Sequence, residues 1–69
     1  MWTVLKIRNG TLEKQHYNFK TKEKAQQFIV ELTTEPDVVY TEVEQRQFEA
    51  MSKDEVKTYC HKVYIVVSG

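Results

Sequence analysis

The residues with the greatest chemical reactivity in this sequence are Cys60 and His61, which are adjacent. A nucleophilic cysteine needs a base within hydrogen-bond reach and a third group that orients the base. Adjacent side chains point to opposite faces of a strand and lie roughly 100° apart around a helix, so neither element brings this pair together. The arrangement therefore indicates a structural, half-buried Cys60.

Other catalytic and metal-binding patterns are missing from the sequence. No serine lies in an elbow motif, and Gly10 and Gly69 do not form a phosphate-binding loop ahead of a helix. The candidate metal ligands are His16, Cys60, His61 and scattered carboxylates, which show neither Cys-x-x-Cys nor His-x-x-x-His spacing. We therefore expect a protein that is not an enzyme and that binds no metal or other cofactor.

Length and cysteine content limit the size and setting of the fold. The 69 residues suffice for a single small domain, which we assign to residues 1–69. Cys60 is the only cysteine, so no disulfide forms within the chain, and a lone thiol is typical of a reducing compartment. No apolar run approaches the ~20 residues of a membrane span, and the N-terminus lacks a signal-peptide pattern. We expect a soluble, cytoplasmic protein with no membrane partner.

The pattern of residues 2–19 predicts a β-hairpin. Strand-forming residues flank Asn9-Gly10, a strong turn signal because both residues tolerate a positive φ. A two-residue turn scatters the large side chains over both faces, whereas a three-residue loop with Gly10 in a bulge groups them on one face. We favour the second register, because a one-residue slip reverses which side chains meet the core. The grouped side chains are Leu5, Ile7, Tyr17 and Phe19.

The stretch after the hairpin has the pattern of an amphipathic helix. Thr21 is a suitable N-cap, and an apolar stripe follows at positions i, i+3, i+4 and i+7. Glu35 and Pro36 do not continue a helix comfortably, so the helix is expected to end near Thr33. The stripe consists of Ala25, Phe28, Ile29 and Leu32.

The second half of the sequence is less uniform. Residues 38–43 are β-branched and aromatic, which predicts a third strand, while residues 44–51 fit either a helix or a longer strand. Ser52-Lys53-Asp54-Glu55 has the form of a capping box and predicts a short helix over about 53–60. A long hairpin turning at 52–55 is the alternative for this region.

The last apolar run completes the expected fold. Residues 63–67 are apolar on both faces, which predicts a strand inside the sheet. The fold class is therefore α+β with the order β-β-α-β-(short α)-β. We expect a small, mostly antiparallel sheet of about four strands, with one main amphipathic helix packed on one face.

Charge is balanced overall but segregated along the chain. The formal net charge is +0, yet residues 1–24 are predominantly basic and residues 25–55 predominantly acidic. A neutral total argues against a general nucleic-acid coat protein. The sequence leaves open whether the two halves form separate faces or interleave in space.

The basic residues of the hairpin and the helix start could contact nucleic acid. Phosphate binds such clusters and also the free N–H groups of a helix N-terminus. The candidate contacts are Lys6, Arg8, Lys14, Lys20, Lys22 and Lys24.

One segment resembles a known family. Phe19-Lys20-Thr21-Lys22-Glu23-Lys24-Ala25-Gln26-Gln27-Phe28, after a hairpin that begins at Trp2, is similar to the strand-to-helix junction of the AP2-like arm-binding domains of phage integrases. The resemblance implies a sheet that reads DNA with a helix packed behind it. It covers less than half of the chain, and the sequence departs from the family pattern because only two predicted strands precede the helix and an acidic segment follows.

The acidic segment suits a basic surface on a partner protein. The chain also has more large side chains than one helix on a sheet needs, so some are expected in an exposed patch of the kind found at interfaces. The candidate interface residues are Tyr40, Glu42, Glu44, Arg46, Phe48 and Glu49.

Together these features favour a small non-enzymatic regulator or inhibitor that binds another protein. Its size and style suggest a phage or mobile-element product that acts on a host protein in the host cytoplasm. A DNA-binding accessory module that uses the basic hairpin is the first alternative. A structural subunit that exists as a homodimer is the second.

Overall fold

The computed structural model describes residues 1–32 and 35–68, without the side chain of Ser68. Its elements are β1 (Trp2–Arg8), β2 (Thr11–Phe19), α1 (Lys22–Glu31), β3 (Val38–Glu44), α2 (Gln45–Ala50) and α3 (Lys53–Ser68). The strands form one antiparallel sheet in the order β2-β1-β3. The chain is therefore a small α+β fold whose described part has three strands in place of the expected four.

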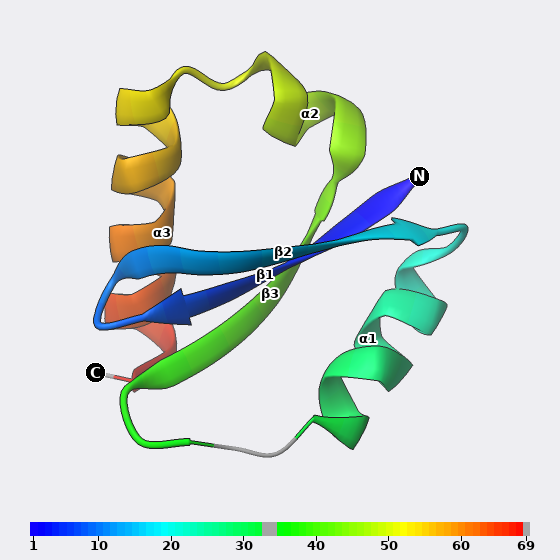
Figure 1. Cartoon of the computed structure of the whole chain (residues 1–69), viewed down its shortest axis with the longest axis horizontal. Coiled ribbons are helices and arrows are strands. Elements are labelled where there is room, and N and C mark those ends of the chain that lie inside the picture. Colours follow the sequence, from blue (N-terminus) through cyan, green and yellow to red (C-terminus); the bar gives the residue numbers. More distant parts are fainter. Residues whose placement is uncertain (33–34, 69) are drawn as a thin grey trace.

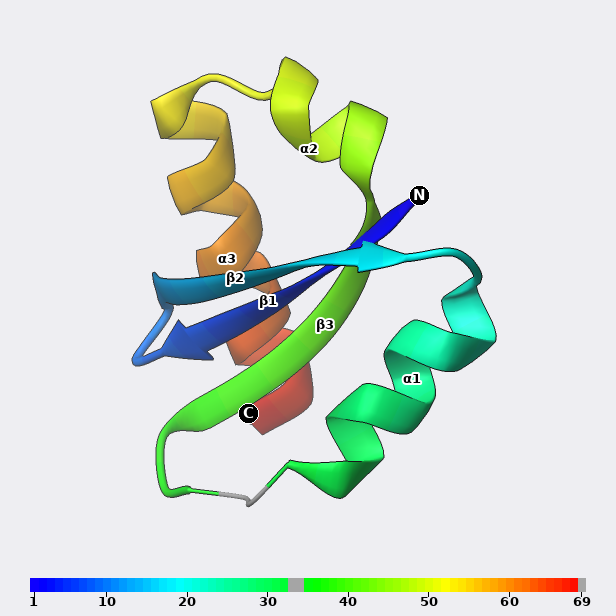
Figure 2. The same ribbon diagram turned by 45° about the vertical axis from the view of Figure 1, so that its right-hand side comes forward.

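The sheet is covered on both faces, with α1 on one side and α3 on the other (Figures 1 and 2). Successive side chains of the central strand β1 point to opposite faces. Leu5 and Ile7 pack in a core with Val39, Phe48 and Cys60 on the side of α2 and α3. Val4 points to the other side and is fully buried beneath α1. Helices on both faces make three layers, whereas a single helix layer was expected.

The β1–β2 turn contains two residues, and the expected three-residue loop is wrong. Asn9 and Gly10 have φ values of 52° and 81°, and Arg8 pairs directly with Thr11. A positive φ at both central positions is typical of a two-residue hairpin turn. Space is also tight at Gly10, because a Cβ there would lie 3.1 Å from Nδ1 of the exposed His61 on α3, which would then have to shift.

The large side chains of β2 lie on both faces because the strand contains two shifts in register. Phe19 packs against Phe28 of α1, with ring centroids 5.0 Å apart, whereas Leu12 packs on the core on the α3 side. Tyr17 lines the same hollow as Leu12 and Phe48, so Leu5, Ile7 and Tyr17 share the α3 side as expected, and of the four predicted side chains Phe19 alone lies on the other face. With helices on both faces, a scattered pattern buries more apolar surface.

Strand β2 is irregular. Lys6 pairs with Lys14 and Ile7 with Leu12, which leaves Glu13 as the additional residue of a β-bulge. A second shift in register lies nearer the end of β2, where Asn18 has a φ of 76°. By contrast, β3 pairs with β1 in a continuous register from Val38 to Glu44.

Helix α1 begins as predicted. Thr21 is its N-cap, and the Thr21 hydroxyl accepts a hydrogen bond of 3.1 Å from the backbone N–H of Lys24. The helix ends at Glu31 with Leu32 as its C-cap, and Thr33 lies outside the described residues. Within the predicted stripe, Ala25 is buried and the other three side chains are half-buried.

Residues 45–68 form two helices, and the expected strand at 63–67 is wrong. The capping box is confirmed, since Ser52 and Glu55 exchange two hydrogen bonds of 3.2 Å between their side chains and backbone N–H groups. The helix that starts there continues to Ser68, well beyond the predicted end at 60. Val56, Cys60 and Val63 supply a core-facing stripe at helical spacing, so tertiary packing outweighs the β propensity of the valines.

Candidate interaction surface

The six residues expected to form a protein interface lie in different environments. Tyr40, Glu42 and Glu44 alternate along β3 on the side of α1 and are half-buried. Glu42 accepts a hydrogen bond of 3.1 Å from Nε2 of Gln26, and Glu44 lies 3.4 Å from the amino group of Met1. These carboxylates thus bind groups of the same chain.

The remaining members of the set lie on α2. Arg46 and Glu49 are exposed, and Glu49 accepts a hydrogen bond from Gln45. Phe48 is buried in the core on the α3 side of the sheet and is not available to a partner. The structure therefore does not gather the six residues into one patch.

Two of the six basic residues form ion pairs within the fold. Arg8 contacts Glu13 at 2.9 Å and Glu35 at 2.6 Å, and Lys6 contacts the same carboxylates at 3.2 and 3.7 Å. Hydrogen bonds from Arg8 lower the pKa of both carboxyl groups, and the bond to Glu13 raises the pKa of Lys6. The cluster links β1, β2 and the segment before β3, and it neutralises these two basic side chains.

The other four lysines do not converge on a face of the sheet. Lys14, Lys20 and Lys24 are exposed, and Nζ of Lys22 lies 5.9 Å from the ring centre of Trp2. A sheet that reads DNA needs an open face, and helices cover both faces here. The geometry implied by the resemblance to AP2-like domains therefore does not match this arrangement.

The reactive residues are held apart. Cys60 is fully buried, and this burial raises the pKa of its thiol, which disfavours the nucleophilic thiolate. His61 is exposed on α3. His16 stacks against Phe28 with ring centroids 4.9 Å apart, and burial lowers the pKa of its imidazole. Among residues 1–32 and 35–68, no three His, Cys, Asp or Glu side chains form a group that could hold a metal ion.

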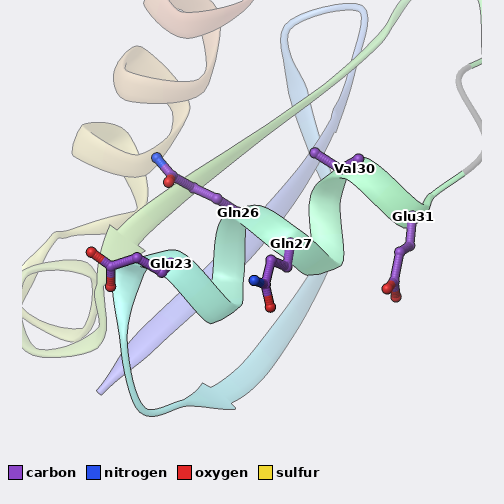
Figure 3. Close-up of a pocket in the computed structure, with 5 residues that line it drawn as sticks. All are labelled: Glu23, Gln26, Gln27, Val30 and Glu31. Atoms are coloured by element: carbon purple, nitrogen blue, oxygen red, sulfur yellow. The ribbon is translucent and has the colours of Figure 1, made fainter.

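A shallow hollow lies on the outer surface of α1 (Figure 3). It is lined by Glu23, Gln26, Gln27, Val30 and Glu31. In the close-up these side chains point away from one another, so their polar groups do not converge on a common ligand. The hollow is an exposed helix surface and does not form a binding site.

The outer edge of β3 carries backbone polar groups that face away from the sheet. The backbone N–H of Asn9 bonds the carbonyl of Asp37 at 2.9 Å, and that of Gln45 bonds Met1 at the same distance. Residues in an antiparallel strand alternate between pointing their backbone groups inward and outward. Odd-numbered residues of β3 therefore face β1, and even-numbered residues present N–H and C=O groups to the outside.

Little of the described chain covers this edge. The sheet order places β3 at the end of the sheet, so no described strand lies beyond it. The N–H of Val38 bonds the carbonyl of Glu35 at 3.3 Å. The backbone groups of Tyr40 and Glu42 remain directed outward without a strand partner among the described residues.

An exposed apolar surface adjoins this edge. Ile65, Val66 and Val67 in the last turn of α3 have exposed fractions of 54%, 82% and 62%. The hydroxyl of Tyr64 donates to Asp37 at 3.4 Å, which fixes this end of α3 beside the start of β3 (Figures 1 and 2). We name the outer edge of β3 together with residues 65–67 the β3–α3 surface.

Sequence reasoning missed the β3–α3 surface because it placed residues 63–67 in the sheet. The available signal was the capping box at Ser52, which sets the helical phase. Counting from there, Ile65 and Val66 fall off the stripe that contains Cys60 and Val63.

None of the described helices is both long and apolar enough to cross a membrane. No protein-family model, curated protein or solved structure matches the chain.

Proposed function

We propose that this chain is a small, non-enzymatic protein-binding regulator. We further propose that it binds through the β3–α3 surface and not through the acidic residues 42–49. The observation that supports this choice most strongly is the outward-facing backbone of Tyr40 and Glu42 beside an exposed apolar helix end.

A sheet edge and an apolar patch supply complementary parts of a protein interface. An added strand gains main-chain hydrogen bonds at the edge, which is a common mode of peptide recognition. Exposed aliphatic side chains next to the edge add buried apolar area, and such patches mark interaction sites. The segregated acidic residues that suggested an interface in the sequence are bonded within the chain or lie apart.

Three variants compared as bait in affinity capture test the proposal. Glu42→Pro removes an outward N–H, together with the carboxylate that accepts a hydrogen bond from Gln26, and so blocks strand addition while it leaves the ladder with β1 intact. Val66→Lys introduces a charge at the exposed helix end. The control is the double variant Arg46→Glu, Glu49→Lys, which reverses exposed charges on α2.

Each bait is first checked for wild-type secondary structure by circular dichroism. We expect the proteins that wild type retains, quantified by mass spectrometry, to be lost from both β3–α3 variants and kept by the α2 control. Loss from the α2 control alone would place the interface in the acidic segment and contradict the proposal.

A further inference from the structure

We infer that the partner at the outer edge of β3 is a second copy of the chain. The two copies pair their β3 strands antiparallel about a two-fold axis at Thr41, which joins two three-stranded sheets into one continuous sheet. This inference rests on the proposed function, since it names the partner of the β3–α3 surface.

The two edges of the sheet differ in their capacity to pair. Bulges and charged side chains protect natural edge strands against unwanted pairing. Strand β2 has two shifts in register, with Glu13 in one of them. Strand β3 has seven residues, no shift in register and no proline or lysine, and its charged residues Glu42 and Glu44 bind groups of the same chain. Of the two edges of the described sheet, β3 therefore presents the regular one to another strand.

The sequence of β3 is complementary to itself about an axis at Thr41. Two residues directly opposite each other in an antiparallel pair must both direct their backbone N–H and C=O groups toward the other strand or both direct them away from it. A two-fold axis between two adjacent residues would place an outward residue opposite an inward one. The axis must therefore lie at a residue. An axis at Thr41 overlaps the whole strand and places Tyr40 opposite Glu42 of the second copy. An axis at Glu42 places two carboxylates directly opposite each other, which is destabilising.

The Thr41 register also matches the backbone directions. Tyr40 and Glu42 point outward, so each exchanges both backbone hydrogen bonds with the other residue in the second copy. Thr41 points its backbone toward β1 and forms a non-hydrogen-bonded pair with its own symmetry mate. Pairs of this kind bring side chains closest together, and threonine pairs are favourable there.

The exposed end of α3 gives independent support. Antiparallel pairing places the start of β3 beside the end of β3 in the second copy. Helix α2 follows that end directly at Gln45 and contributes Phe48 to the same side of the sheet as α3. The second copy's α2 therefore lies next to residues 65–67, so that pairing removes part of this apolar surface from water.

Disulfide trapping tests both the partner and the register. In a non-hydrogen-bonded pair the Cα atoms are about 4.5 Å apart, which is within the range of a disulfide. Thr41→Cys is therefore expected to form a covalent dimer in an oxidised glutathione buffer. Glu42→Cys is the register control, because its thiols are opposite each other only if the axis lies at Glu42.

Thr58→Cys, at an exposed position on α3, is the control for random collision. Pairing raises the local thiol concentration, so Thr41→Cys should cross-link at least about tenfold faster than Thr58→Cys. The wild-type chain reports the background from Cys60, which is buried. Peptide mapping by mass spectrometry identifies the cysteine in each cross-link.

Sedimentation of the wild-type chain, which needs no substitution, gives the second readout. We expect a monomer–dimer equilibrium that Glu42→Pro shifts to monomer. Equal rates for Thr41→Cys and Thr58→Cys, faster cross-linking of Glu42→Cys, or a wild-type monomer at millimolar concentration would each overturn the inference. The proposed function fails separately, if the β3–α3 variants retain all the proteins that wild type captures.

Discussion

At the scale of single residues, Lys6 and Arg8 show why charge along a sequence is a poor guide to charge on a surface. Both belong to the basic N-terminal segment, yet Glu13 and Glu35 neutralise them in the fold. Glu13 is near in sequence and reaches them because it occupies a bulge. Glu35 is distant in sequence. It reaches Lys6 and Arg8 because α1 connects β2 to β3 and Glu35 lies just before β3.

His16 provides a test at the same scale. Burial, followed by the charges of Lys14 and Lys6, lowers the pKa of its imidazole below 6.5 in the folded chain. The unfolded chain therefore binds the proton more readily, and the stability that depends on neutral His16 is complete above pH 6.5 and decreases as the pH falls below that value. We expect His16→Gln to flatten this decrease in urea-unfolding midpoints.

A second pH window serves as an internal control for His16. Glu13 and Glu35 have pKa values lowered from 4.5, so the stability that they contribute is lost only as the pH falls below 4.5. The loss of stability below pH 4.5 should therefore be unchanged in the His16→Gln variant. Parallel curves for the two proteins between pH 6.5 and pH 4.5 would show that His16 is not the responsible group.

At the scale of elements, local signals predicted starts better than ends. Thr21 and the Ser52–Glu55 box identified the beginnings of α1 and α3, because capping depends on residues within one turn. The β3 strand and the position of the Asn9-Gly10 turn were also predictable from local chemistry, whereas the predicted number of turn residues was wrong. The length of α3 was not, since valines at 63, 66 and 67 favour a strand until packing against the sheet is known.

The expected interface failed for a similar reason. Phe48 was assigned to the surface because one helix layer seemed to leave too little core for it. The structure has helices on both faces, and Phe48 fills the side that the prediction left bare. Whether an aromatic side chain is buried depends on the number of layers, which local patterns do not specify.

Substitutions along α3 test whether its last turns are an exposed helix. Val66→Lys should change the free energy of unfolding by no more than about 0.5 kcal/mol, because Val66 is 82% exposed and lysine favours helix more than valine does. Val63→Lys, on the core-facing stripe, should cost at least about 1 kcal/mol. Urea unfolding followed by circular dichroism, at low protein concentration, measures both.

The two substitutions also distinguish the helix from the strand expected from the sequence. An interior strand would bury residue 66 as thoroughly as residue 63, since both faces of the sheet are covered. Similar losses of stability for the two variants would therefore contradict the helical assignment.

At the scale of the whole molecule, a three-stranded sheet between helices leaves few places for a partner. The faces are covered, and bulges disrupt pairing along β2. What remains is the edge of β3, next to an apolar helix end. This combination connects two of the three hypotheses from the sequence, a protein-binding regulator and a homodimer, through one surface.

Amide hydrogen exchange along β3 tests most directly whether its outer edge is the binding surface. Thr41 donates its N–H toward β1, so it should exchange slowly at any protein concentration. Tyr40 and Glu42 donate outward, so they should exchange rapidly at low micromolar concentration and become protected at millimolar concentration as the edges pair. Rapid exchange of Tyr40 and Glu42 at both concentrations would mean that no second copy pairs at this edge. Protection at both concentrations in a chain that sediments as a monomer would mean that the edge is not open.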